Sequence, residues 1–260
     1  MICILVVCVW QAAFFIDTGN MITGINALWI TFVVCNLMDS NNQVHYIMEL
    51  FGMECGTLKK VLLINGSPHK EGCTFTALTE VAKELRKYGV DTNIFQIGTK
   101  PIRGCIACEK CRELSKCVFD DDIANRLLSE IGQADGVVIG SPVYFGGPNG
   151  ALCAALDRVF YAGMDSDPFS GKPGAAVVSC RRGGARATFD RLNKYFMPVI
   201  SSQYWNSVHG FTPDDVRKDL EGLQTMRTLG ANMAWVLNSI EKASIEPPEK
   251  EPRVLTNFID

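Results

Sequence analysis

Residues 60–89 read KVLLINGSPHKEGCTFTALTEVAKELRKYG, and this stretch decides the predicted fold. It opens with four consecutive apolar residues at 61–64, which is typical of a strand buried on both faces. A polar loop with two glycines follows at 65–73. An amphipathic helix comes next, with apolar residues at helical spacing: Leu78, Val81, Ala82 and Leu85. Strand, tight loop and helix form the first unit of an open parallel α/β sheet.

The loop at 65–73, called the first loop below, leads into a helix N-terminus just beyond the carboxyl end of the strand. Free N–H groups and the helix dipole favour an anion there. The loop offers the hydroxyls of Ser67, Thr74 and Thr76 and the cation of Lys70. It has neither a Walker A motif nor the Gly-x-Gly-x-x-Gly fingerprint, so it suits a phosphate monoester such as that of FMN. The alternative is an ordinary turn with solvated hydroxyls.

The rest of the chain alternates between predicted strands and helices. Strands are expected at 91–97, 136–140, 174–180 and 204–209, and further helices at about 123–131, 151–162, 187–196 and 213–240. Strict alternation predicts a parallel sheet with helices on both faces. We therefore predict a flavodoxin-like three-layer α/β sandwich with a five-stranded parallel sheet in the order 2-1-3-4-5.

This topology places the loop after the third strand, called the second loop, beside the first loop. That loop and its helix read SPVYFGGPNGALCAALDR at 141–158. Apolar and aromatic side chains suit the faces of a flavin ring, and glycines let backbone N–H groups approach its edge. The apolar and aromatic residues here are Pro142, Val143, Tyr144 and Phe145, and the glycines are Gly146 and Gly147. Asp157 and Arg158 are interpreted as a structural pair near the end of the helix.

The motifs GSP at 66–68 with Thr74, SPVYFGG at 141–147 and LDR at 156–158 resemble the flavodoxin-like NADPH-dependent FMN reductase family, over about 59–241. The resemblance implies FMN as cofactor, NAD(P)H as co-substrate and a homodimer or homotetramer. It implies a phosphate loop of Ser67, His69, Lys70, Cys73, Thr74 and Thr76. It places the isoalloxazine against 142–147 and adds a third loop, with Ser179, Arg182, Gly183 and Gly184. Relatives often carry Arg and Asn where this chain has His69 and Cys73, which leaves more of the anion binding to backbone N–H groups.

The most specific chemical signal is a C-x2-C-x2-C-x5-C run after the second strand: Cys105, Cys108, Cys111 and Cys117. Four thiolates this close can ligate a [4Fe–4S] cluster or tetrahedral zinc. Free redox thiols and inert packing are the other interpretations. The compact run is more like ferredoxin ligation than the two separated pairs usual for structural zinc. On this fold it resembles the iron–sulfur flavoproteins, a branch of the same family, which implies a [4Fe–4S] cluster that passes single electrons to FMN.

The predicted function is therefore an FMN-dependent oxidoreductase. Its donor is NAD(P)H or a ferredoxin-like carrier, and its acceptor is a small molecule or a protein. The alternative is a non-catalytic zinc-binding interaction module on a flavodoxin-like scaffold. The net charge of -3 and the lack of a basic run argue against a dedicated nucleic-acid binder. The 11 cysteines, odd in number and locally clustered, fit the reducing cytoplasm better than a disulfide framework.

Residues 1–56 differ from the rest of the chain. No Lys or Arg precedes Lys59, and apolar runs occupy 2–16 and 21–38. Each run is short of the roughly 20 residues that a membrane-spanning helix needs, and no basic flank sets a topology. We predict a non-native extension ahead of a start at Met53, with a membrane anchor as the alternative. The flavodoxin-like domain is expected at 57–245 and an irregular tail at 246–260.

Overall fold

The computed structural model describes residues 58–196 and 198–243, together with Ile245, Glu249, Glu251 and Val254. The extension expected at 1–56 and nearly all of the tail expected at 246–260 lie outside these residues. Within the described part of the chain, no helix combines the length and the apolar character needed to cross a membrane. The expected domain boundaries stay predictions.

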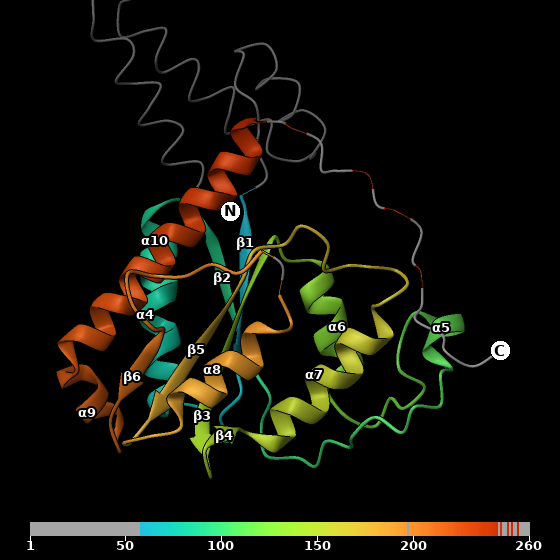
Figure 1. The fold of residues 1–260 in the computed structure, drawn as a ribbon, viewed down its shortest axis with the longest axis horizontal. Coiled ribbons are helices and arrows are strands. Elements are labelled where there is room, and N and C mark those ends of the chain that lie inside the picture. Colours follow the sequence, from blue (N-terminus) through green and yellow to red (C-terminus); the bar gives the residue numbers. More distant parts are fainter. Residues whose placement is uncertain are drawn as a thin grey trace, which may run out of the picture. The chain divides into compact units, whose positions relative to one another are not determined.

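Parallel strands form the centre of the described fold (Figure 1): β1 Lys60–Asn65, β2 Asp91–Gln96, β3 Gly136–Tyr144, β5 Gly174–Cys180 and β6 Ser207–His209. They lie in the order β2-β1-β3-β5-β6. This is the predicted order 2-1-3-4-5 when the parallel strands are numbered among themselves. β1 and β5 are buried almost throughout because both faces of the sheet are covered. The predicted flavodoxin-like sandwich is confirmed.

An apolar core lies on each face of the sheet, and Figure 1 shows the two helical layers that cover them. The helices of one layer are α4 Cys73–Lys87, α9 Pro213–Lys218 and α10 Leu220–Ala243. Those of the other are α6 Ala124–Gly132, α7 Gly150–Ala162 and α8 Ala185–Asn193. Successive residues of β1 alternate between them: Val61 and Leu63 enter the first core, Leu62 and Ile64 the second.

The third strand is longer than its sequence predicts. Ser141 and Pro142, expected in a loop, still pair with β5 in the parallel sheet. Val143 and Tyr144 then pair with a short antiparallel strand, β4 Gly147–Pro148, which was not predicted. The second loop is therefore the tip of a tight hairpin.

The helix expected at 213–240 is broken at Asp219, between α9 and α10. The Asp219 carboxylate accepts the N–H of Gly222 at 2.9 Å, as an N-cap does, and the N–H of His209 at 2.7 Å. The cap and the link to β6 favour a new helix over a continued one. The last strand is also shorter than expected, because only Ser207–His209 of the predicted 204–209 pairs with β5.

Arg158 on α7 pairs with Asp122, which corrects the expected pairing with its neighbour Asp157. The Arg158 and Asp122 side chains are 1% and 4% exposed. Adjacent residues on a helix point in different directions, and Asp157 instead accepts from Arg191 of α8 at 2.8 Å. Burial favours a raised pKa for Asp122. The hydrogen bonds from Arg158 and from two backbone N–H groups outweigh burial, so the pKa of Asp122 lies below its ordinary value.

Replacing Asp122 by Asn should destabilise the protein by about 3–5 kcal/mol near neutral pH, because the buried Arg158 charge loses its partner. The pKa of Asp122 is lower in the folded than in the unfolded protein. Its stabilisation is therefore present above the unfolded pKa, about 4, and is lost as the pH falls toward the folded pKa. In urea unfolding, the difference between wild type and Asp122→Asn should stay constant from about pH 7 to about pH 5 and should shrink as the pH falls below about 4.

Asp121→Asn is the matched control. Asp121 is the preceding residue, and its ion pair with Arg103, at 2.9 Å, lies on the surface with side chains 62% and 46% exposed. Its loss should cost about 0–1 kcal/mol. Two results would contradict stabilisation by the buried ion pair. One is an equal loss of stability in the two variants, and the other is an Asp122→Asn difference that grows as the pH falls.

Candidate functional site

The first loop is folded around two amide side chains, Asn65 and Gln96, which are not among the predicted site residues. Asn65 Nδ2 donates to the carbonyls of His69 and Lys70, each at 3.3 Å, and Asn65 Oδ1 accepts the N–H of Ser67 at 3.1 Å. Gln96 accepts from Asn65 Nδ2 at 2.6 Å and donates to Ser67 O at 2.7 Å. An Asn before Gly-Ser is a recognisable Asx-turn signal. The contribution of Gln96 depends on the pairing of β1 with β2.

The N-terminus of α4 is open toward this loop. Gly72 is its N-cap, and no side chain of the described residues caps it or places an acidic group in its first turn. Ser67 is buried, and its Oγ accepts the N–H of His69 at 3.1 Å. Thr76 Oγ1 donates back to Gly72 O at 3.1 Å. The exposed residues of the loop include His69 and Lys70. Free N–H groups at the positive end of a helix dipole suit an anion.

The third loop lies between β5 and α8. The end of β5 before it contacts the start of α4, and Gly184 within it lies against the second loop. Thr74 Oγ1 and Ser179 Oγ, both buried, share a hydrogen bond of 2.8 Å. Gly184 has a φ of 86°, and a Cβ on it would lie 2.6 Å from Val143 Cγ1 of the second loop. Cys73 Sγ lies 3.9 Å from a backbone carbonyl in the loop after β6. The remaining predicted residues of the third loop are exposed: Arg182 and Gly183.

Asn149, the N-cap of α7, links the first loop to the second. Its Oδ1 accepts the N–H of Ala151 at 3.1 Å, and its Nδ2 donates to Gly66 O at 2.7 Å. Its own N–H donates to Ser141 Oγ at 3.0 Å. Gly66 N in turn donates to Gly140 O at 2.8 Å. The capping role was readable from the sequence, but the contact with Gly66 depends on the assembled sheet.

The second loop presents aromatic side chains at the same edge. Phe145 and Gly146 have φ values of 49° and 82° and join β3 to β4, as in a two-residue hairpin turn. A positive φ is uncommon for a residue such as Phe. Tyr144 is 44% exposed and Phe145 fully exposed. The half-buried residues of this loop are Pro142, Val143 and Gly147. Aromatic groups beside glycine backbone are thus available to a planar ligand.

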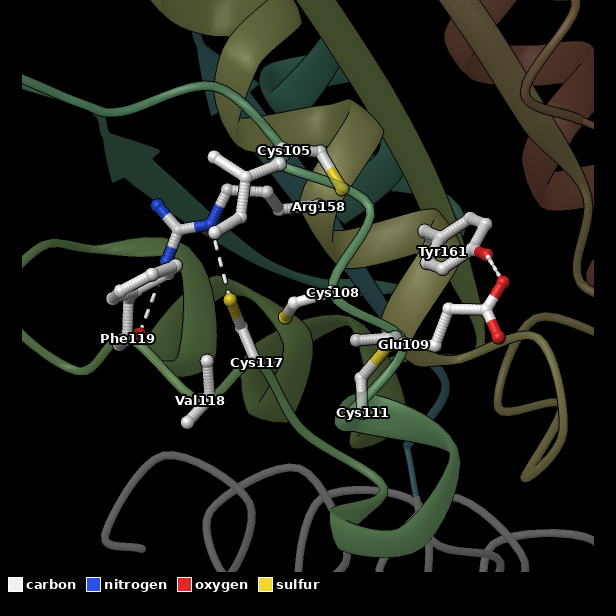
Figure 2. Close-up of a pocket in the computed structure, with 11 residues that line it drawn as sticks. Cys105, Cys108, Glu109, Cys111, Cys117, Val118, Phe119, Arg158 and Tyr161 are labelled. Atoms are coloured by element: carbon white, nitrogen blue, oxygen red, sulfur yellow. Dashed lines mark hydrogen bonds between the residues drawn. The ribbon is translucent and has the colours of Figure 1, made fainter.

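The four cysteines of the C-x2-C-x2-C-x5-C run line one hollow beside α7 (Figure 2): Cys105, Cys108, Cys111 and Cys117. All four are free thiols. Cys111 begins the short helix α5 Cys111–Leu114, and burial together with the neighbouring thiols raises its pKa. Arg158 and Tyr161 of α7 line the same hollow. The structure therefore brings the predicted ligand set to one place.

Three non-glycine residues of this loop have a left-handed backbone conformation. Ala107, Glu109 and Ser115 have φ values of 52°, 59° and 52°, and such conformations cost energy for non-glycine residues. The N–H of Ala107 points to Cys105 Sγ at 3.4 Å. Backbone that alternates between right- and left-handed conformations directs N–H groups inward and forms concavities that hold anions, iron–sulfur clusters included.

The donor chemistry fits a four-thiolate centre, either [4Fe–4S] or zinc. Within the described residues, no three His, Cys, Asp or Glu side chains already stand close enough to hold a metal ion. To hold such a centre, the sulfurs would have to draw together. Residues 101–109 have no helix or strand to prevent this, and Cys105 and Cys108 are exposed.

Solved structures with this fold include FerB and RosB. FerB, a flavoenzyme NAD(P)H:(acceptor) oxidoreductase from Paracoccus denitrificans, has a TM-score of 0.52 at 18% identity, covering 70% of this chain and 98% of that one. RosB has a TM-score of 0.53 at 14% identity, covering 78% and 92%. At these identities the likeness concerns the fold alone.

Sequence comparison identifies the family. An iron–sulfur flavoprotein of Methanocaldococcus jannaschii is 33% identical over 193 residues, which are 70% of this chain and 100% of that protein. One from Methanosarcina thermophila is 30% identical over 192 residues, 70% of this chain and 97% of that protein. Residues 59–212, more than half of the chain, match the family model of the NADPH-dependent FMN reductases. The chain therefore belongs to the NADPH-dependent FMN reductase family.

Proposed function

We propose that this protein is an FMN-dependent oxidoreductase of the iron–sulfur flavoprotein type. The observation that carries the proposal is that four free thiols line one hollow in a chain of the FMN reductase family. The names of the relatives at 33% and 30% identity support the same pair of cofactors here. Electrons would come from NAD(P)H or a ferredoxin-like donor and pass to a small-molecule or protein acceptor. A cytoplasmic location and a homodimer or homotetramer belong to the proposal.

The first loop and the open N-terminus of α4 would hold the FMN phosphate. Backbone N–H groups of the first turn would face it, the buried hydroxyls of Ser67 and Thr74 would add donors, and exposed Lys70 would add a cation. The ring would lie against the second loop, 142–147, and the third loop beside it. When bound, FMN supplies the redox chemistry. The residues of this chain would orient it, shield its ring and present backbone donors to its edge.

The four cysteines would ligate a [4Fe–4S] cluster, which takes four thiolates. The N–H of Ala107, which points to Cys105 Sγ, would favour the negative charge of such a centre. Zinc bound by the same thiolates is the alternative, and it supports no electron transfer.

Protein purified without oxygen should contain FMN and about four irons per chain, with acid-labile sulfide in equal amount. Cys117→Ser should lose most of the iron and keep FMN, because one of four ligands is gone. Cys153→Ser is the matched control: it is a free, partly buried thiol on α7 that does not line the hollow, and it should keep both. Metal analysis, sulfide assay and absorption spectra measure this. Zinc, or flavin without iron, would overturn the cluster assignment, and a protein unable to bind FMN would overturn the whole proposal.

Asn65→Ala should weaken FMN binding about tenfold, because the first loop loses the amide that holds its shape before the ligand arrives. Riboflavin has the same ring but no phosphate, so its affinity should stay unchanged. Fluorescence titration of flavin-free protein with each ligand measures both values. Asn93→Ala, which removes an exposed amide 3.4 Å from Glu130, is the control. An equal loss of riboflavin and FMN affinity would show that this loop does not bind the phosphate.

A further inference from the structure

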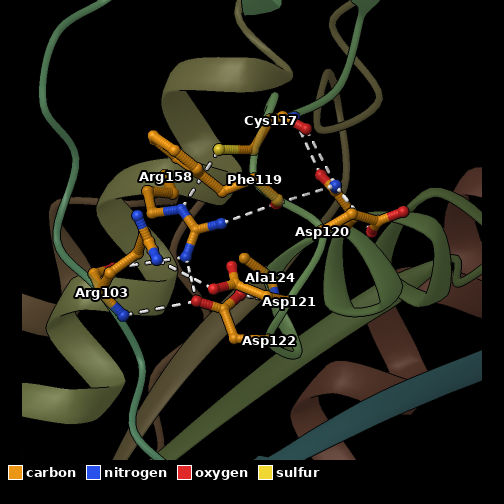
Figure 3. Close-up of polar contacts among 9 residues, drawn as sticks. Arg103, Cys117, Phe119, Asp120, Asp121, Asp122, Ala124 and Arg158 are labelled. Atoms are coloured by element: carbon orange, nitrogen blue, oxygen red, sulfur yellow. Dashed lines mark hydrogen bonds and ion pairs between the residues drawn. The ribbon is translucent and has the colours of Figure 1, made fainter.

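Arg158 is buried beneath the thiol hollow with a partner for every guanidinium nitrogen (Figure 3). Nη1 pairs with Asp122 and donates to Arg103 O at 3.3 Å, and Nη2 donates to Phe119 O at 3.0 Å. Nε donates to Cys117 Sγ at 3.2 Å. The side chain thus joins α7 to the loop before the cysteines, the last cysteine and the residues after it.

The contact with sulfur is not accounted for by the ion pair. Asp122 already neutralises the guanidinium, and a buried ion pair gives little net stability compared with apolar packing. A neutral thiol is a weak acceptor. A hydrogen bond to an anionic acceptor is roughly twice as strong as one between neutral groups. The Nε–H hydrogen bond is therefore strongest when the Cys117 sulfur is a thiolate that ligates a metal centre.

Cys117 is also the ligand whose backbone is fixed on both sides. Its N–H donates to Asn125 Oδ1 at 2.8 Å, and its carbonyl accepts from Asn125 Nδ2 at 2.9 Å. Cys105 and Cys108, in contrast, are exposed. Arg158 and Asn125 together hold one sulfur in a defined place, around which the other three can close.

On the basis of the function proposed above, we propose that Arg158 is a positioning residue for the cluster. Its Nε–H hydrogen bond holds the Cys117 sulfur as a ligand and raises the reduction potential of the cluster. On reduction, the cluster gains one electron that its donor loses, and no bond to Cys117 breaks. The reduced cluster carries one more negative charge, shared with the sulfur ligands. A donor fixed on one of those sulfurs therefore stabilises the reduced state more than the oxidised one.

The choice of arginine supports a directional role. The planar guanidinium sends three nitrogens to the carboxylate, the carbonyls and the sulfur at fixed angles. A lysine at this position keeps the charge that pairs with Asp122, but its single ammonium cannot replace the Nε–H at the sulfur as well. Arg158→Lys therefore separates the hydrogen bond from the charge.

The test is a redox titration of the anaerobic holoprotein, with the cluster followed by electron paramagnetic resonance. Arg158→Lys should keep FMN and lower the midpoint potential of the cluster. At the wild-type midpoint, the ratio of reduced to oxidised cluster should fall about tenfold, which corresponds to about 59 mV for one electron. Arg112→Lys is the matched control. Arg112 is exposed on α5, next to Cys111, and its Nε lies 3.7 Å from Glu109 Oε2, so its replacement should leave the midpoint unchanged.

A second measurement needs no variant. In wild-type protein with 15N-labelled arginine, the reduced cluster should show a hyperfine coupling to an arginine nitrogen, and Arg112→Lys should leave this coupling in place. Two results would overturn this inference alone. One is an Arg158→Lys protein that contains iron and has an unchanged midpoint potential. The other is a wild-type protein that contains iron and shows no such coupling. Wild-type protein with flavin and no iron would overturn the proposed cluster and this inference together.

Discussion

The site at the sheet edge depends on the backbone contacts of Gly66. Its N–H donates to Gly140 O of β3, and its carbonyl accepts from Asn149 at the start of α7. A Cβ on Gly66 would lie 2.4 Å from Leu152 Cδ2 and 2.6 Å from Gly140 O. The first loop, β3 and α7 can meet only because this residue has no side chain. Their meeting fixes the first loop relative to the hairpin that presents Tyr144 and Phe145.

Most of the fold could be predicted from local signals. The apolar run at 61–64 identified β1, and β5 was predicted at its observed bounds, Gly174–Cys180. The alternation of strands and helices indicated a parallel sheet, and the five strands suited the flavodoxin-like order that is observed. Errors occurred where a distant contact overrides a local pattern. Asp219 ends one helix and starts the next because its carboxylate also accepts from β6. The extra length of β3 depends on pairing with β5 and β4.

In the candidate site too, local features could be predicted from the sequence and distant contacts could not. The sequence identified its three loops and the four cysteines, because residue types and spacings are local properties. It did not identify the residues that hold those loops in place, because these reach across the fold. Asn149 bonds to a glycine 83 positions earlier, and Arg158 to a cysteine 41 positions earlier. The pairing of Arg158 with Asp157 could have been rejected from helix geometry alone, since adjacent side chains diverge.

Helix α7 connects the first loop at the sheet edge to the thiol hollow. It begins at Gly150, after the asparagine tied to the first loop, and Arg158 lies eight residues later beneath the cysteines. Eight residues span about 12 Å along a helix axis. The length of the helix therefore sets the distance between the sheet edge and the thiol hollow. Adding or removing one residue between these points would rotate one end by about 100° against the other and change their separation by about 1.5 Å. The sequence of this segment can vary on its exposed side, but its length is set by the two sites at its ends.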